Sequence, residues 1–250
     1  MQIKNLDKFY GPIKAVNDVS FDIPRGKVTA LIGPNGAGKS TVLHIITRLI
    51  KRDGGTVTLD GKEMLDYKSA ELAKKMSILT QNNNMTMKLT VEELVAFGRF
   101  PHSGTKLNEE DKKIIADSIA YMELEEFTNS FIDEMSGGQQ QRAFIAMVLA
   151  QDTDIVFLDE PTNNLDIYHS LSMMNLLRKL CDELGKTVVV VLHDINFASR
   201  YCDYIGAFFE GGLYMFDTVD KVMTKENLKN LYRVDFDVQQ VDGKPIALYY

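Results

Sequence analysis

The stretch of sequence that decides the fold is Gly33-Pro34-Asn35-Gly36-Ala37-Gly38-Lys39-Ser40-Thr41. It fits the pattern G-x-x-x-x-G-K-[ST] of phosphate-binding loops, and its flanks supply the context that this pattern requires. Residues 28–32 before it predict a buried β-strand, and apolar residues at helical spacing over 42–46 predict a helix after it. Backbone N–H groups at a helix N-terminus attract a phosphate chain. We expect Lys39 to reach the terminal phosphates and the Ser40 hydroxyl to bind Mg²⁺.

The bulk composition is that of an ordinary globular protein. Its 250 residues can bury a substantial core, as one large domain or two lobes. The 28 basic and 35 acidic side chains give a net charge of -7, which argues against a broad nucleic-acid-binding surface. Cys181 and Cys202 have neither metal-ligand spacing nor a disulfide framework, which favours a cytosolic setting. No signal peptide and no apolar run of about 18 residues is visible, so any membrane role is expected to come through a partner.

The rest of the chain alternates strand and helix patterns around one stretch without strands. Strands are predicted at residues 2–9, 16–23, 56–60, 76–80, 155–158, 187–192, 204–209 and 213–217, and helices at 69–75 and 225–232. A capping box from Thr90 to Glu93 predicts a helix start, and a final hairpin is expected around residues 242–244. Residues 85–150 carry no strand pattern. They are therefore expected to form a helical insert in an α/β core.

A second helix N-terminus that attracts anions is predicted at Ser136-Gly137-Gly138, before helical spacing in residues 139–148. Serine is a good N-cap, and a helix start without bulky side chains exposes its N–H groups. An ordinary cap with flexible glycines would look the same. The Gln-rich first turn, residues 139–141, has no obvious packing reason in the sequence.

Polar side chains follow two predicted strands where each strand ends. Asp159 and Glu160 follow the apolar run 155–158, and His193 follows the strand that ends at residue 192. Ligands of open α/β sheets bind at the carboxyl ends of the strands. Asp159 is suited to Mg²⁺, Glu160 to orienting or deprotonating a water, and His193 to a terminal phosphate. Tyr10, just after the first strand, can stack on a purine, although each of these residues alone is as easily structural.

With these motifs in this order, the sequence resembles the ATP-binding cassette (ABC) ATPases across nearly its whole length. The matching motifs are GPNGAGKST at 33–41 (Walker A), Gln81 (Q-loop), SGGQQQR at 136–142 (signature), IVFLDE at 155–160 (Walker B) and NNLD at 163–166 (D-loop). His193 falls at the family's switch histidine and Tyr10 at its adenine-stacking aromatic. Met135 stands where leucine is usual, which is a conservative change. The resemblance implies an active ATPase that uses ATP and Mg²⁺.

The same resemblance implies the fold. It is an α/β P-loop NTPase core with a mostly parallel sheet, an N-terminal antiparallel β-subdomain and an inserted α-helical subdomain. The chain 1–250 is then a single ABC ATPase domain. Its core would comprise residues 1–84 and 151–250, and its helical subdomain residues 85–150.

The resemblance also assigns roles to individual residues of this sequence. The implied catalytic residues are Lys39, Glu160 and His193. The implied contacts to Mg²⁺ are Ser40, Gln81 and Asp159. The implied contacts to the nucleotide are Tyr10, Val16, Asn35, Gly36, Ala37, Gly38, Lys39, Ser40, Thr41, Gln81, Ser136, Gly137, Gly138, Gln139, Asp166 and His193.

The partners implied by the resemblance are proteins. Two copies would face head-to-tail, so that Ser136, Gly137 and Gly138 of one close over the γ-phosphate held by Lys39 of the other. Transmembrane permease subunits would receive this dimer at the cytoplasmic face of the cell membrane. A separate substrate-binding protein would deliver the cargo, and no nucleic acid is expected.

A finer resemblance lies in Gly98-Arg99-Phe100-Pro101-His102. This run is similar to a stretch in cassettes that power ferric-siderophore, haem and cobalamin importers. A helix that ends at Gly98 and is stopped by the proline would be its structural explanation. Among non-transport cassettes, repair proteins carry a very long coiled coil and translation factors carry two cassettes, unlike this chain. A small-molecule kinase would leave Ser136 to Gln139 and His193 unexplained, whereas an iron–sulfur cluster assembly ATPase remains the alternative.

Overall fold

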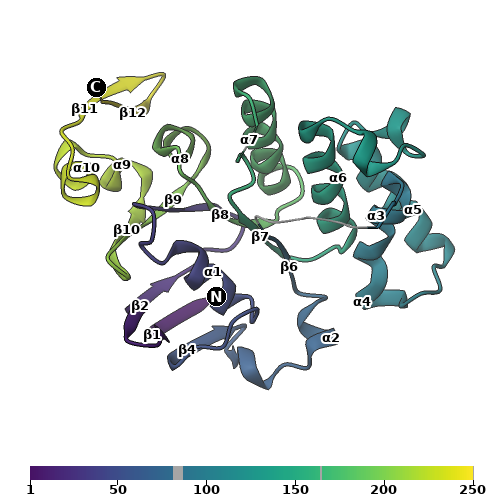
Figure 1. Ribbon diagram of the computed structural model, residues 1–250, viewed down its shortest axis with the longest axis horizontal. Coiled ribbons are helices and arrows are strands. Elements are labelled where there is room, and N and C mark those ends of the chain that lie inside the picture. The colour runs from purple at the N-terminus through teal and green to yellow at the C-terminus, as the bar shows by residue number, and fades with distance from the viewer. Residues whose placement is uncertain (81–86, 164, 250) are drawn as a thin grey trace. The chain divides into compact units, whose positions relative to one another are not determined.

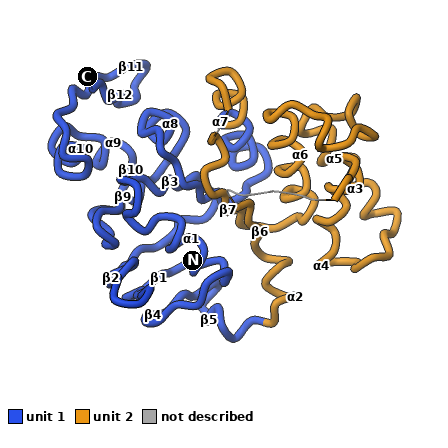
Figure 2. Tube along the Cα trace, in the orientation of Figure 1, with its two compact units in different colours: residues 1–67, 174–250 blue, residues 68–173 orange. Residues whose placement is uncertain are grey.

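The computed structural model describes residues 1–80, 87–163 and 165–249 (Figure 1). The chain divides into two compact units, which Figure 2 distinguishes by colour. Unit 1 comprises residues 1–67 and 174–250, and unit 2 comprises residues 68–173. Among the residues described, no helix is long and apolar enough to cross a membrane. The division into a core and a helical subdomain at residues 85 and 150 stays a prediction.

Unit 1 begins with an antiparallel sheet. Its strands lie in the order β2-β1-β4-β5 and are β1 (Gln2–Tyr10), β2 (Ile13–Asp22), β4 (Gly54–Leu59) and β5 (Lys62–Glu63), followed by the turn η1 (Met64–Asp66). Val16, Val19 and Phe21 of β2 are buried while Asn17, Ser20 and Asp22 between and after them are exposed, as one solvated sheet face requires. The strands expected from this pattern are confirmed, with both members of the first hairpin extended toward its turn.

The second sheet of unit 1 is parallel at its centre. Here β3 (Val28–Ile32) lies between β8 (Thr187–Val191) and β9 (Tyr204–Phe209), and β10 (Gly212–Thr218) runs antiparallel to β9. Ala30 pairs with Val190 on one side and Ile205 on the other. All five residues of β3 and of β8 are buried, which explains why both sequences are apolar except for one threonine each. This central strand leads through the phosphate loop to α1 (Lys39–Ile46).

The C-terminal part of unit 1 consists of short helices and one hairpin. The elements are α8 (Ile195–Tyr201), α9 (Val219–Val222), α10 (Lys225–Tyr232), β11 (Asp237–Val241) and β12 (Lys244–Leu248). The predicted helix over 225–232 and the hairpin around 242–244 are both confirmed. The side chain of Asn196 in α8 donates to the Ala247 carbonyl (3.1 Å) and accepts from the Ala247 N–H (2.8 Å), which fixes the hairpin on α8.

Unit 2 pairs two parallel strands with a group of helices. Its elements are α2 (Ser69–Leu72), β6 (Met76–Leu79), α3 (Val91–Ala96), η2 (Phe97–Arg99), α4 (Phe100–Ser103), α5 (Glu109–Tyr121), η3 (Glu125–Phe127), η4 (Ile132–Glu134), α6 (Gly137–Ala150), β7 (Ile155–Asp159) and the start of α7 (Ile167–Asp182). The described residues 87–150 contain no strand beyond an isolated bridge between Thr90 and Phe131, as predicted. The Thr90–Glu93 capping box is present, whereas α2 is shorter than expected.

The structure corrects the structural explanation of the Gly98 run. Gly98 ends no helix, because α3 passes through the turn η2 directly into α4, and Pro101 lies in the first turn of α4. Glycine is required here by packing: a Cβ at position 98 would overlap the Met147 carbonyl oxygen of α6. The backbone of this turn therefore rests directly on α6.

A buried ion pair lies beside that contact. The Arg99 guanidinium donates to the Asp111 carboxylate (2.8 Å) and to the Ala150 carbonyl at the end of α6 (2.8 Å). Ser103 and the backbone N–H of Asn108 also donate to Asp111. These bonds, with Ser103 first, then Asn108 and Arg99, lower the pKa of Asp111 to about 2. The run Gly98–His102 thus anchors the far end of α6.

Candidate functional site

The phosphate loop contains three glycines whose backbone angles favour glycine, and at two of them a side chain would not fit. Gly33, Gly36 and Gly38 all have positive φ angles, of 142°, 77° and 95°. A Cβ at Gly33 would overlap the Phe208 carbonyl oxygen, and one at Gly38 would lie 2.6 Å from the Ala15 carbonyl oxygen. The loop therefore needs glycine both for its backbone angles and for its close approach to β9 and β2.

The first turn of α1 is open to an anion. Its N-cap, Gly38, makes no side-chain capping bond, and the first turn contains no acidic residue. Lys39 is 5% exposed, and its ammonium donates to the carbonyls of Gly33 (2.8 Å) and Pro34 (3.0 Å) across the loop. A buried cation at a helix N-terminus whose N–H groups lack side-chain caps suits a polyphosphate.

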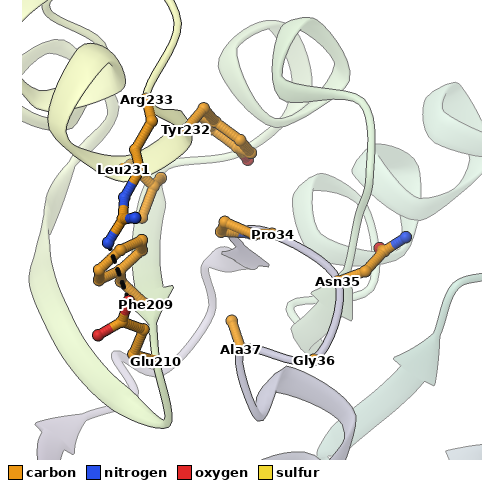
Figure 3. A pocket seen from close by; sticks show the side chains of 9 residues that line it. All are labelled: Pro34, Asn35, Gly36, Ala37, Phe209, Glu210, Leu231, Tyr232 and Arg233. Carbon is orange, nitrogen blue, oxygen red and sulfur yellow. Dashed lines mark hydrogen bonds and ion pairs between the residues drawn. The ribbon is translucent and has the colours of Figure 1, made fainter.

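A pocket of about 340 Å³ adjoins the loop (Figure 3). Its lining residues are Pro34, Asn35, Gly36, Ala37, Phe209, Glu210, Leu231, Tyr232 and Arg233. Arg233 pairs with Glu210 (2.9 Å) and lies 5.0 Å from the centre of the Phe209 ring. Burial raises the pKa of Tyr232 well above its usual value. The pocket residues at the ends of β9 and α10 were not among the predicted site residues.

The other predicted residues of unit 1 differ in their exposure to solvent and in their position in the sheets. Tyr10, at the end of β1, is 47% exposed, and Lys8 lies 5.5 Å above its ring. Val16 is fully buried in the sheet, so its side chain is not presented to solvent. His193 is exposed and follows β8, the parallel neighbour of β3. The carboxyl ends of neighbouring parallel strands share one edge, so His193 and the phosphate loop lie at the same edge of this sheet.

In unit 2, the predicted acidic pair ends a buried strand. All five residues of β7 are buried, and Asp159 is 3% exposed. Glu160 has a φ of 53°, a left-handed backbone that a non-glycine residue rarely adopts. Its carboxylate accepts a hydrogen bond from the Asn163 side chain. The bond to Asn163 therefore holds the Glu160 carboxylate in place directly after β7.

The predicted second anion site is a helix start with a complete capping box. Ser136 is the N-cap of α6: its hydroxyl accepts from the Gln139 N–H (3.4 Å), and its own N–H donates to the Gln139 side chain (3.0 Å). Gln140 donates to the carbonyls of Ile132 and Met135. The Gln-rich turn, which has no obvious reason in the sequence, thus closes both the cap and the preceding turn.

The remaining predicted positions lie around the start of α7. Asp166 is exposed and accepts from the His169 backbone N–H and ring, both at 2.8 Å; the first of these bonds is the largest cause of its lowered pKa. Gln81 and Asn164 lie outside the described residues. Unit 1 thus gathers the phosphate loop, Tyr10 and His193. Unit 2 separately carries Ser136 to Gln139, the pair after β7 and Asp166.

These features define a P-loop nucleotide-binding α/β protein with a second, capped helix N-terminus in a helical insert. The ABC transporter family model matches residues 16–163 of the chain. The petrobactin import ATP-binding protein YclP of Bacillus subtilis (strain 168) is 48% identical over 250 residues, covering 100% of this chain and 99% of YclP. The iron(3+)-hydroxamate import ATP-binding protein FhuC of the same organism is 40% identical over 245 residues, covering 96% and 91%.

A solved structure agrees with these relatives. The post-hydrolysis dimer of the ATP-binding cassette MJ0796, bound to ADP and phosphate, is 37% identical, with a TM-score of 0.77 over 87% of this chain and 97% of that one. The chain belongs to the ABC transporter family. It is an ATP-hydrolysing cassette with the fold that the resemblance implied, and it uses adenine nucleotides.

Proposed function

We propose that this chain is the ATPase subunit that powers import of an iron(III)-siderophore complex through a membrane permease. Its relatives YclP and FhuC are named for petrobactin import and for iron(3+)-hydroxamate import. The observation that carries the proposal is that the likeness covers the whole chain, helical insert included, and extends beyond the nucleotide-binding motifs. Within the insert, the run Gly98–His102 packs on α6 and bonds to its C-terminal end, so this part of the likeness has a structural role.

Unit 1 is the proposed binding site for the triphosphate. We expect the base to stack on the exposed Tyr10 ring, and Val16 stays a proposed contact through the surface of the strand that buries it. The phosphates are proposed to bind the backbone N–H groups of residues 35–41, where Lys39 supplies the positive charge. Ser40, Gln81 and Asp159 are the proposed contacts to Mg²⁺. They are all oxygen donors, which this ion prefers. When bound, Mg²⁺ neutralises charge on the phosphate oxygens.

Hydrolysis is proposed to depend on Glu160 and His193. A carboxylate fixed by Asn163 and by a left-handed backbone has few orientations open to it, which suits a group that must orient and deprotonate one water. His193, exposed at the edge that carries the phosphate loop, is suited to a hydrogen bond with the γ-phosphate. Lys39 stabilises the charge that develops on the transferred phosphoryl group.

The second anion site, at the start of α6, is proposed to serve the nucleotide that the other copy of the chain holds. Ser136, Gly137, Gly138 and Gln139 of one copy, with Asp166, would contact the nucleotide held by the other in a head-to-tail homodimer. The dimeric state of MJ0796 with ADP and phosphate supports this arrangement. Release of phosphate would remove the charge that joins the two copies and so convert hydrolysis into movement.

The permease is proposed to dock on the helical insert. A pocket of about 330 Å³ there is lined by Leu89, Glu93, Ala96, Phe97, Phe100, Gly104, Thr105 and Leu107. Phe97 and Phe100 are 47% and 60% exposed, and large apolar side chains left in solvent mark protein-binding surfaces. This docking would hold the cassette peripherally at the cytoplasmic face of the membrane. A substrate-binding protein would act on the other side and touch the permease alone.

Growth of a strain that lacks the gene tests this proposal. The strain is supplied with ferric petrobactin, a ferric hydroxamate or an inorganic iron salt, and is complemented with wild type, Glu160→Gln or the exposed control Glu126→Gln. We expect wild type and the control to restore growth on one siderophore, and Glu160→Gln to restore none. Equal growth of the uncomplemented strain on every source, with a soluble scaffold as the only protein that co-purifies, would instead support a role in cluster assembly.

A further inference from the structure

The ring of His169 lies between two predicted site segments of unit 2. It sits in the first turn of α7, directly after the D-loop, and its side chain is 32% exposed. Neither the motifs nor the resemblance singles this residue out. Its contacts nevertheless reach Asp166 on one side and the first turn of the signature helix α6 on the other.

The contact with Asp166 is a pair of hydrogen bonds. The Asp166 carboxylate accepts from the backbone N–H of His169 and from ring Nδ1, both at 2.8 Å. An ionised carboxylate only accepts hydrogen bonds, so Nδ1 must carry the hydrogen. The backbone bond alone would cap the start of α7. The ring bond adds a constraint on the orientation of the carboxylate, which is otherwise exposed to solvent.

The contact with the signature is steric. A Cβ at Gly138 would overlap ring atom Cδ2 of His169 and lie 2.9 Å from Cγ, so the ring occupies the space beside the Gly138 Cα atom. A Cβ at Gly137, one residue earlier in the same turn, would meet nothing within 4 Å. The two glycines of the signature therefore differ: the second is needed within the protomer because His169 packs against it.

We infer that His169 is a positioning residue that couples the D-loop to the signature helix within one copy of the chain. This inference rests on the proposed function, in which Asp166 and residues 136–139 both meet the nucleotide of the other copy. One rigid imidazole joined to both segments keeps them at a fixed spacing. The start of α6 is then already in place when the second copy arrives, so less ordering is needed in the closed state.

Three variants separate the two contacts. His169→Ala removes both. His169→Asn keeps a donor close to the position of Nδ1 but removes most of the ring. Gly138→Ala adds a methyl group that collides with the ring only when His169 is present. If the ring is the link, the effect of Gly138→Ala will be smaller in the His169→Asn background than in wild type, because the effects of contacting residues are not additive.

The variants are compared by steady-state ATP hydrolysis and by amide hydrogen exchange. In steady-state hydrolysis we expect His169→Ala to lower kcat about 10-fold with KM for ATP changed less than about 2-fold, because the phosphate loop is untouched. In the isolated chain without nucleotide, hydrogen exchange of the amides at 137–141 should accelerate in His169→Ala and less in His169→Asn, with α5 as the internal reference. A residue that only stabilised the fold would raise exchange in α5 as well.

The outcomes distinguish this inference from the proposed function. The coupling is overturned if the wild type hydrolyses ATP and His169→Ala changes neither kcat nor amide exchange at 137–141. It is also overturned if the effects of Gly138→Ala and His169→Asn are strictly additive. Either result leaves the proposed ATPase function intact. Wild-type protein that does not hydrolyse ATP overturns the function. In that case the exchange experiment still decides whether the ring holds the start of α6.

Discussion

The two helix starts that the sequence marks as anion sites differ in how their N–H groups are satisfied. α1 is preceded by Gly38 in a left-handed conformation and has no side-chain cap, and a buried lysine lies beside it. α6 is preceded by Ser136, which forms a complete capping box with Gln139. We expect the open start to bind a ligand of its own protomer. In the capped start the Ser136 hydroxyl accepts from the Gln139 N–H, so we expect a nucleotide to contact this start only when the other copy already holds it.

The largest expected effect comes from removing the charge at the open start. Lys39→Ala should weaken ATP binding and lower kcat by about 10²–10³-fold, since its ammonium is the cation built into the loop. Isothermal titration and a phosphate-release assay measure the two effects. Lys113→Ala, an exposed lysine of α5, is the matched control. Full activity of Lys39→Ala would mean that the open helix start alone binds the phosphates.

A smaller and more selective effect is expected at the capped start. Ser136→Ala removes one half of the capping box and should cost about 1 kcal/mol of stability. We expect kcat to fall about 10-fold while the isolated chain binds ATP as tightly as wild type, because Ser136 is assigned to the other copy's nucleotide. If Ser136→Ala weakened ATP binding by the monomer, the two starts would serve one site and the comparison would fail.

The smallest effect concerns the far end of α6. The pKa of Asp111 is lowered to about 2, so its ion pair with Arg99 stabilises the fold fully above the ordinary carboxyl pKa near 4 and is lost as pH falls toward 2. Asp111→Asn should therefore lower the melting temperature at pH 7 and flatten its decline between pH 4 and 2. The exposed Asp117→Asn is the control. Thermal unfolding across this pH range measures the melting temperatures of both variants. Equal melting temperatures of Asp111→Asn and wild type at pH 7 would contradict a stabilising ion pair.

Local chemistry explains which parts of the fold could be predicted. The strand before Gly33, the helix after Lys39 and the capping box at Thr90 depend on residues close together in sequence, and all three are confirmed. The packing reason for Gly98 could not be predicted, because the Met147 carbonyl that requires a glycine there is remote in sequence. The roles of Gln140 and His169 depend likewise on partners that the chain brings close only on folding.

The residues of the site were predictable where a local motif covers them. Motif spacing named the residues of both helix starts, and the structure shows how each is held. Motif spacing did not indicate that Arg233, Glu210 and Tyr232 border the loop, because no motif covers the segment after β9. The sequence signals at these positions are a glutamate beside the Gly211-Gly212 turn and an arginine directly after a helix that ends in tyrosine.

The molecular mass of Glu160→Gln protein in solution tests the central claim most directly. Without nucleotide we expect light scattering to report the 28.2 kDa of one chain, and with MgATP about twice that mass, since the capped start of each copy then closes on the other's nucleotide. Adding Ser136→Ala should return the protein to one chain although ATP remains bound. A protein that binds MgATP tightly and stays at the mass of one chain would contradict the account.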